Sequence, residues 1–247
     1  MSKRKFSFTL FVVFLLSAMA VASVTAQPRI PGVSAGNWFK YGDISVHWSS
    51  DDPNATVSPY LKKMNETEYI MISIVGVIGT NITCEITTHF KNGTEETFGG
   101  YVNIDTGDGE NLIPMIISAG LDENDTVYTS GSYSTMKINE TVTRTYPDQT
   151  RDTNHVNITT EQSNMGSYQF ASWNYYWDRS TGMAVEISGE SITQSEGFNT
   201  TWSGHQRITE SDVWVIPEFP SLLILPLLMI ATVLAVIVYR RKHTITA

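Results

Sequence analysis

The chain has 247 residues, of which 41% are hydrophobic and 17% charged, and its formal net charge is −9. This length accommodates one well-packed domain together with terminal segments, and the single cysteine excludes an intrachain disulfide. The acidic balance disfavours nucleic acid and anionic lipid headgroups as partners.

The first 26 residues have the organisation of a secretory signal peptide. Basic side chains occupy positions 3–5, an apolar stretch covers 6–24, and small residues before Ala26 form a cleavage site. We predict cleavage after Ala26. The alternative is an uncleaved, second membrane-spanning helix.

The segment 27–214 is predicted to form one extracellular antiparallel β domain. It holds ten basic and 24 acidic residues, a net charge of about −14. One short helix is expected early in it, because Ser58 is a good N-cap and Pro59 suits the first helical position. The apolar run 112–121 is interrupted by Pro114 and Gly120, so it is either a short helix or an irregular crossing segment.

Alternation of apolar and polar residues predicts a three-stranded meander between residues 68 and 104. Its turns fall near 79–80 and at Asn92-Gly93, which is a favoured hairpin turn. Cys84 is in phase with neighbouring isoleucines, so we expect a buried core residue. Gly99-Gly100 is expected to mark a bulge or a strong bend.

Further strands are predicted in the second half of the domain. The ranges are 141–146, 155–160, 168–177 with 183–188 as a hairpin around 178–182, and 206–215. The pattern favours an all-β fold of about eight to ten antiparallel strands that hides its edges by curling. A half-open barrel is the expected form and a sandwich is the alternative.

Aromatic residues crowd the range 168–177 on both faces of the predicted strand. One aromatic face is suited to lining an apolar cavity or stacking on a sugar ring, and the alternative is that these rings simply fill the core. Trp173, Tyr175 and Trp177 are therefore the candidate ligand-binding residues, for a lipid or a carbohydrate.

Motifs typical of catalysis are missing from the sequence. It contains no G-x-S-x-G, H-E-x-x-H or C-x-x-C motif and no Gly-rich phosphate loop. The acidic range 105–110 departs from the spacing of a Ca²⁺ loop, which favours an ordinary turn. The histidines at 47, 89, 155 and 205 are isolated from one another. We therefore predict no enzymatic activity, no cofactor and no metal site.

Eight N-x-S/T triplets without a central proline lie in this domain and predict a glycoprotein. Every acceptor must then be exposed in the folded domain. The acceptors are Asn54, Asn65, Asn81, Asn92, Asn124, Asn139, Asn157 and Asn199.

The carboxyl-terminal residues have the organisation of a membrane anchor. A linker, 215–221, contains Pro217, Glu218 and Phe219, and an apolar run follows at 222–239. Eighteen helical residues span roughly 27 Å, about the hydrocarbon thickness of a bilayer. The basic tail, 240–247, belongs on the cytoplasmic side, so the protein is expected to be a single-pass cell-membrane protein with its N-terminal domain outside.

This tail resembles the PEF-type C-terminal sorting signal of archaeal surface proteins. The resemblance implies processing near Pro217-Glu218-Phe219 by an archaeosortase-type enzyme, and a permanent spanning anchor is the alternative. The ectodomain resembles uncharacterised archaeal cell-surface proteins through the motifs at 36–42 and 176–182. That second resemblance implies no known activity.

These features predict a non-catalytic, N-glycosylated, membrane-anchored surface protein. Its expected role is in envelope structure, contact with surface-layer proteins, or binding of an extracellular glycan, lipid or partner. The alternative is a carrier of lipid or another hydrophobic ligand, in which a continuous apolar cavity lies under the aromatic strand. An extracellular hydrolase is a third alternative, for which no catalytic set is recognisable.

Overall fold

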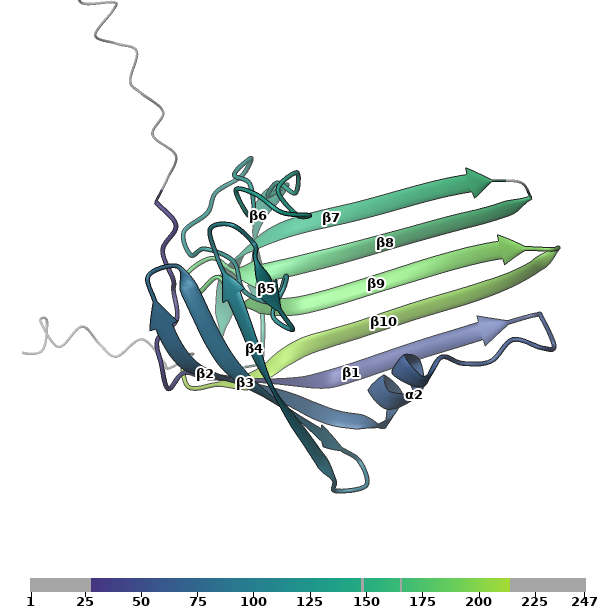
Figure 1. Ribbon diagram of the computed structural model, residues 1–247, viewed down its shortest axis with the longest axis horizontal. Coiled ribbons are helices and arrows are strands. Elements are labelled where there is room, and N and C mark those ends of the chain that lie inside the picture. The colour runs from purple at the N-terminus through teal and green to yellow at the C-terminus, as the bar shows by residue number, and fades with distance from the viewer. Residues whose placement is uncertain (1–27, 148, 165, 214–247) are drawn as a thin grey trace, which may run out of the picture.

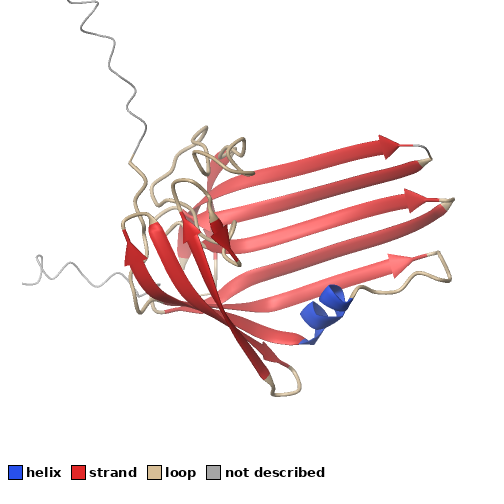
Figure 2. Cartoon of the chain, viewed as in Figure 1, coloured by secondary structure: helices blue, strands red, loops and turns tan. Residues whose placement is uncertain are grey.

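The computed structural model describes residues 28–147, 149–164 and 166–213, which form ten strands and one α-helix (Figures 1 and 2). The predicted signal peptide, the PEF motif, the spanning segment 222–239 and the basic tail lie outside these residues. Among the residues described, no helix has both the length and the apolar character needed to cross a bilayer.

The longest of the described strands, β7, has 15 residues. Their bounds are β1 Trp38–Ser50, α2 Pro59–Glu66, β2 Thr67–Ile78, β3 Asn81–Phe90, β4 Glu95–Asn103, β5 Gly109–Glu110, β6 Glu140–Thr145, β7 Thr150–Asn164, β8 Ser167–Asp178, β9 Ala184–Ser195 and β10 Phe198–Ser211.

All ten strands belong to one antiparallel sheet, in the order β5-β4-β3-β2-β1-β10-β9-β8-β7-β6. The first and last strands pair in the middle of the sheet, and β5 and β6, which are consecutive in sequence, form its two edges. The fold is therefore an up-and-down meander that is open between β5 and β6. The all-β prediction is confirmed, and the sandwich alternative is wrong because there is only one sheet in the described chain.

The predicted meander between 68 and 104 is confirmed as β2, β3 and β4. The bulge expected at Gly99-Gly100 is wrong, because the β3–β4 register runs without a shift from Asn81 to His89. The irregularities lie in β2 instead. Gly100 has a packing role, since a Cβ atom there would lie 2.7 Å from Cδ1 of Leu112.

The sequence pattern did not predict β1, and it placed the start of the last strand too late, at 206 instead of Phe198. Two register shifts interrupt β1, and Asp43, within the second of them, has a φ of +49°. Each bulge changes the phase of the alternation, which hides the strand from a search for period two. The early part of β10 is polar and gains its strand conformation from β1 and β9 on either side.

The core lies on one face of the sheet, here called the inner face. The connection between β5 and β6, residues 111–139 (the inner segment), packs on this face at one end of the sheet and buries Ile116, Leu121 and Tyr128. The Tyr128 hydroxyl donates to the Ile116 carbonyl at 2.8 Å, and Trp177 Nε1 donates to the Pro114 carbonyl at 2.8 Å. The run 112–121 is thus an irregular crossing segment, one of its two predicted forms.

The two halves of the sheet separate beside β1. Residues 38–41 of β1 pair with β2, whereas its remaining residues pair only with β10 (Figure 1). The helix α2 lies where β1 and β2 diverge, close to β1. Beyond the inner segment, α2 roofs the part of the inner face that lies next to β1 and β2.

The described chain begins and ends at the same end of the sheet. The Trp38 amide donates to Asp212 Oδ1 at 2.8 Å, which ties the start of β1 to the residues after β10. The inner segment covers this end, and the β7–β8 and β9–β10 turns project from the opposite end (Figure 1).

Candidate apolar binding groove

The helix α2 forms as predicted, with the Ser58 hydroxyl accepting from the Leu61 amide at 3.2 Å. None of its eight residues is buried, so the helix covers the sheet loosely. Tyr60 and Met64 are one turn apart and share the face that lines the space below. Lys63, which lines the same space, bonds to Glu96 on β4 and so ties the helix to the sheet.

The larger of two cavities beneath α2 has a volume of about 410 Å³. Its floor is the inner face of β1 to β4, where Ile72 and Ile86 are cross-strand neighbours. This volume falls within the usual range for sites that bind small molecules. Its walls are mainly apolar, and its lining includes Tyr41, Tyr60, Met64, Ile70, Ile72, Ile86, Phe98, Met115 and Gln206.

A smaller cavity of about 190 Å³ also borders Tyr60 and Met64, but its floor is formed by β8 to β10. It is lined by Trp173, Tyr175 and Trp202 together with Ile187. The two cavities share four lining side chains, namely Tyr60, Met64, Met115 and Gln206. We call the pair of cavities the groove.

The aromatic rings on the inner face form a continuous row. The ring centroids are 5.1 Å apart for Trp173 and Trp202, 6.3 Å for Trp173 and Tyr175, and 5.4 Å for Tyr175 and Trp177. The Trp173 ring lies directly over Gly189, where a Cβ atom would be 2.5 Å from it. Glycine at this position allows the indole to lie flat along the sheet and form one wall of the groove.

The three predicted ligand-binding residues occupy one strand face but differ in accessibility. Trp173 and Tyr175 line the smaller cavity. Trp177 is fully buried, stacks on Tyr175 and bonds to the inner segment, which places it in the core beside the groove.

The electrostatic character of the groove is nearly neutral. Burial raises the pKa of Tyr175 to about 12, and the neighbouring Tyr133 and Tyr60 add to this effect. The Tyr175 hydroxyl therefore stays protonated at neutral pH and acts as a hydrogen-bond donor. The amine of Lys63 is already bonded to Glu96 and lies 5.6 Å from the centroid of the Phe90 ring.

A larger cavity, of about 540 Å³, lies at the covered end of the sheet, but its charged residues serve the turn beside it. Asp178 is 2% exposed and accepts hydrogen bonds from Thr181 Oγ1 at 2.8 Å and from Arg151 at 3.3 Å. Arg179 bonds to Asp122. These ion pairs fix the turn between β8 and β9. The depression beside the turn is lined by these charged side chains together with Ile30 and Ala119.

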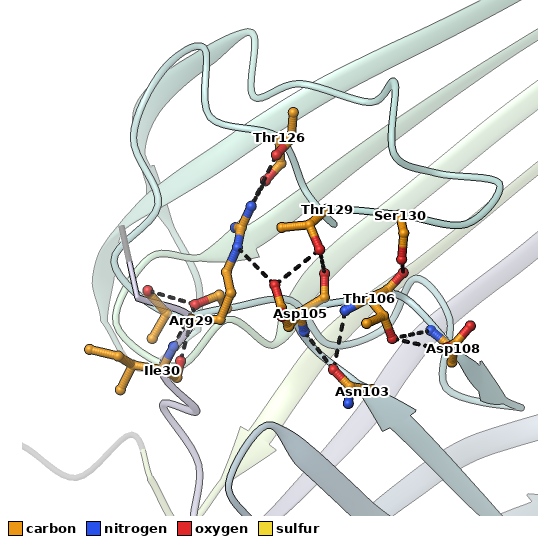
Figure 3. Close-up of polar contacts among 11 residues, drawn as sticks. Arg29, Ile30, Asn103, Asp105, Thr106, Asp108, Thr126, Thr129 and Ser130 are labelled. Atoms are coloured by element: carbon orange, nitrogen blue, oxygen red, sulfur yellow. Dashed lines mark hydrogen bonds and ion pairs between the residues drawn. The ribbon is translucent and has the colours of Figure 1, made fainter. Parts of the chain in front are cut away.

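The acidic range 105–110 lies against the start of the described chain (Figure 3). Asp105 Oδ1 is 4.0 Å from Arg29 Nε and accepts from the Thr129 hydroxyl at 3.1 Å. Asp108 accepts from the Thr106 hydroxyl at 2.8 Å. In the described ranges no three His, Cys, Asp or Glu side chains cluster as a metal site would require.

Three of the four histidines noted in the sequence lie beside carboxylates. His89 contacts Glu68 and Glu95, His155 contacts Glu140, and His205 is 3.4 Å from Glu186. His47 is exposed on β1. None of these contacts brings two histidines together.

Cys84 is buried, as expected from its phase with Ile82 and Ile86. Burial raises the pKa of its thiol to about 12, against the opposing effect of a hydrogen bond with the backbone of Gly100. A thiol of this kind is a poor nucleophile at neutral pH.

The eight sequon asparagines are all exposed in the fold, at turns, in loops, on α2 or on strand faces turned to solvent. Asn157 is exposed on β7 while its neighbour Val156 is buried. The exposure required for glycosylation is therefore met at every acceptor, and their occupancy stays a prediction.

Several groove residues carry no motif and were not singled out from the sequence: Tyr60, Met64, Ile70, Phe98, Met115 and Gln206. The one available signal was the spacing of Tyr60 and Met64, four residues apart on α2. That spacing marks a helix face that contacts something apolar.

Comparison with known proteins adds no family: no family model matches the chain, and no curated protein is similar to it. The arrangement described above holds a groove whose walls are mainly apolar. Such a groove is chemically suited to holding a hydrocarbon chain.

Proposed function

We propose that this is a non-catalytic, N-glycosylated cell-surface protein, anchored by residues 222–239, whose half-barrel domain binds an apolar ligand beneath α2. The observation that supports it best is the groove, in which apolar side chains of β1 to β4 and aromatic side chains of β8 and β10 converge. Binding, not chemistry, suits this site because no nucleophile–base pair faces the groove among its described lining residues.

The amount of apolar surface left beside α2 supports a ligand of hydrocarbon type. The inner segment fills one end of the inner face, whereas Tyr60 on α2 remains 66% exposed and Phe98 on β4 remains 42% exposed. Each methylene removed from water contributes about 0.8 kcal/mol, so a chain of a few methylenes gains useful affinity here.

Photolabelling of the full-length protein in liposomes tests the proposal, with a hexadecane probe that carries a diazirine. We expect saturable labelling of peptides that contain residues 60–64 and 173–175. Ile70→Trp places a large ring in the larger cavity and should exclude at least two methylenes, which lowers labelling about tenfold.

Val75→Trp is the matched control, since Val75 lies on the same strand and is 63% exposed. This variant should label like the original protein. Labelling that is confined to residues 222–239, or that Ile70→Trp leaves unchanged, would contradict binding in the groove.

A further inference from the structure

Gln206 places an amide at the junction of the two cavities. It lies on β10, two residues from Gly204 and two from the buried Ile208, and it lines both cavities. The hydrogen bond that the structure shows for its side chain runs from Nε2 to the sulfur of Met115 over 4.0 Å. A thioether is a weak acceptor, so most of the hydrogen-bonding capacity of this partly buried amide is open to a ligand or to water.

Two further donors line the smaller cavity together with this amide. Trp202 Nε1 is buried and, within the described chain, has no hydrogen-bond partner. The second donor is the hydroxyl of Tyr175, a partly buried residue whose ring lines the same cavity as Trp202 and Gln206. A donor that is removed from water without a partner, as Trp202 Nε1 is, is costly, which favours a ligand that satisfies it.

Charge on the groove walls argues against an ionic group at this position. Lys63 is the cation of the larger cavity, and Glu96 already neutralises it. His205 borders the smaller cavity, and its Nε2 atom is 3.4 Å from Glu186. A carboxylate or phosphate buried here would lose its hydration without gaining a free cation.

We infer that the ligand is a neutral amphiphile, a hydrocarbon chain that ends in a hydroxyl or similar uncharged group, with that group bound by Gln206 at the junction. The chain then occupies the larger cavity toward Ile86 and Phe98, and the polar group faces Gln206, Tyr175 and Trp202. This inference rests on the proposed function, because it specifies the ligand of the same groove.

Competition against the photoactivatable hexadecane tests the inference with the full-length protein in liposomes at pH 8. The competitors are hexadecanol, hexadecane and palmitate at equal mole fractions in the bilayer. One additional hydrogen bond favours hexadecanol over hexadecane about three- to tenfold. Ionised palmitate should compete less well than either.

Two glutamine variants identify the amide as the source of this preference. Gln206→Leu keeps the side-chain volume and removes the amide, so hexadecanol should lose its advantage while hexadecane still competes. Gln169→Leu makes the same substitution at an exposed position of β8 outside both cavities, and it should keep the preference for the alcohol.

A preference for hexadecanol that Gln206→Leu removes and Gln169→Leu retains supports the inference. Equal competition by all three compounds, stronger competition by palmitate, or a preference that survives Gln206→Leu overturns it and leaves apolar binding intact. Absence of saturable labelling in the groove overturns the proposed function itself.

Discussion

Asp178 shows how one buried carboxylate determines the course of the chain. Its Oδ2 atom accepts hydrogen bonds from the Ser180 hydroxyl and from both the amide and the hydroxyl of Thr181, and it pairs with Arg151. The turn from β8 into β9 is built around this atom. The motif at 176–182 thus has a structural role that does not require any activity.

Replacing this carboxylate should destabilise the domain strongly. Asp178→Ala removes the acceptor that several donors and the Arg151 guanidinium share. We expect the free energy of unfolding to fall by about 3 kcal/mol. For a domain of this size, the midpoint of thermal unfolding, followed by tryptophan fluorescence, should fall by about 8 °C.

Asp152→Ala is the matched control, because Asp152 is exposed and accepts from the Thr143 hydroxyl. Its midpoint should change by less than about 2 °C. Equal losses in the two variants would show that the buried network is not what stabilises the turn.

At the scale of elements, α2 is the part of the groove best suited to opening. Eight residues are too few for a stable helix in isolation, and none of them is buried. The helix depends on its Ser58 cap and on contacts at its ends, such as the Lys91 amine bonded to the Asn65 carbonyl at 2.6 Å. A ligand can therefore enter by local displacement of α2 while the sheet stays intact.

Hydrogen exchange should detect this difference. We expect the amides of residues 62–66 to exchange much faster than those of β3. Ser58→Ala removes the cap at a cost of about 1 kcal/mol, which should speed exchange in α2 about fivefold without affecting β3.

Ser195→Ala, at an exposed position at the end of β9, should leave exchange in α2 unchanged. If α2 proved as well protected as β3, a helix that opens independently would be refuted.

At the scale of the whole molecule, part of the outer edge of β7 is left without a neighbouring strand in the described chain. β6 pairs with residues 150–155 of β7, whereas 156–164 bond to β8 alone. Just before β6, Asn139 satisfies one more backbone group of β7, because its Oδ1 atom accepts a hydrogen bond from the Asn157 amide at 2.7 Å. Open strand edges promote association between chains, and both of these asparagines are sequon acceptors.

Glycosylation at Asn157 should therefore keep the protein monomeric. Thr159→Ala abolishes this sequon without changing the asparagine. In a host that glycosylates such sequons, we expect mass spectrometry to show loss of one glycan and cross-linking to show new association through β7.

Thr56→Ala removes the sequon of Asn54, in the loop before α2, and serves as the control. It should lose a glycan without associating. Bare asparagines in the original protein would contradict both the glycoprotein prediction and its protective role.

The local structure could largely be predicted from the pattern of side chains. β3 alternates exposed and buried positions along its length, so its face and turns follow from Ile82, Cys84 and Ile86 alone. β1 could not be found this way, because its bulges change the phase. The sequence pattern also predicted β7, β9 and β10 too short. Their polar ends are strands because they pair with neighbouring strands of the sheet.

The groove could be predicted only in part. Trp173 and Tyr175 were identified from their crowding on one strand, but crowding does not separate a cavity wall from a core residue such as Trp177. The other walls come from positions as far apart as Tyr60, Met115 and Gln206. Only the folded chain brings these side chains together.

Alternation, the N-cap of α2 and the sequons are local properties, so the sequence by itself determined that the domain is antiparallel β with one short helix and exposed asparagines. The tertiary structure alone decided the rest: that β1 pairs with β10, that β2 turns away from β1, and that α2 roofs the space between them. The physical reason is that strand pairing over more than 150 residues and the packing of the inner segment depend on contacts between distant parts of the chain. The groove exists where those contacts leave apolar surface beneath α2.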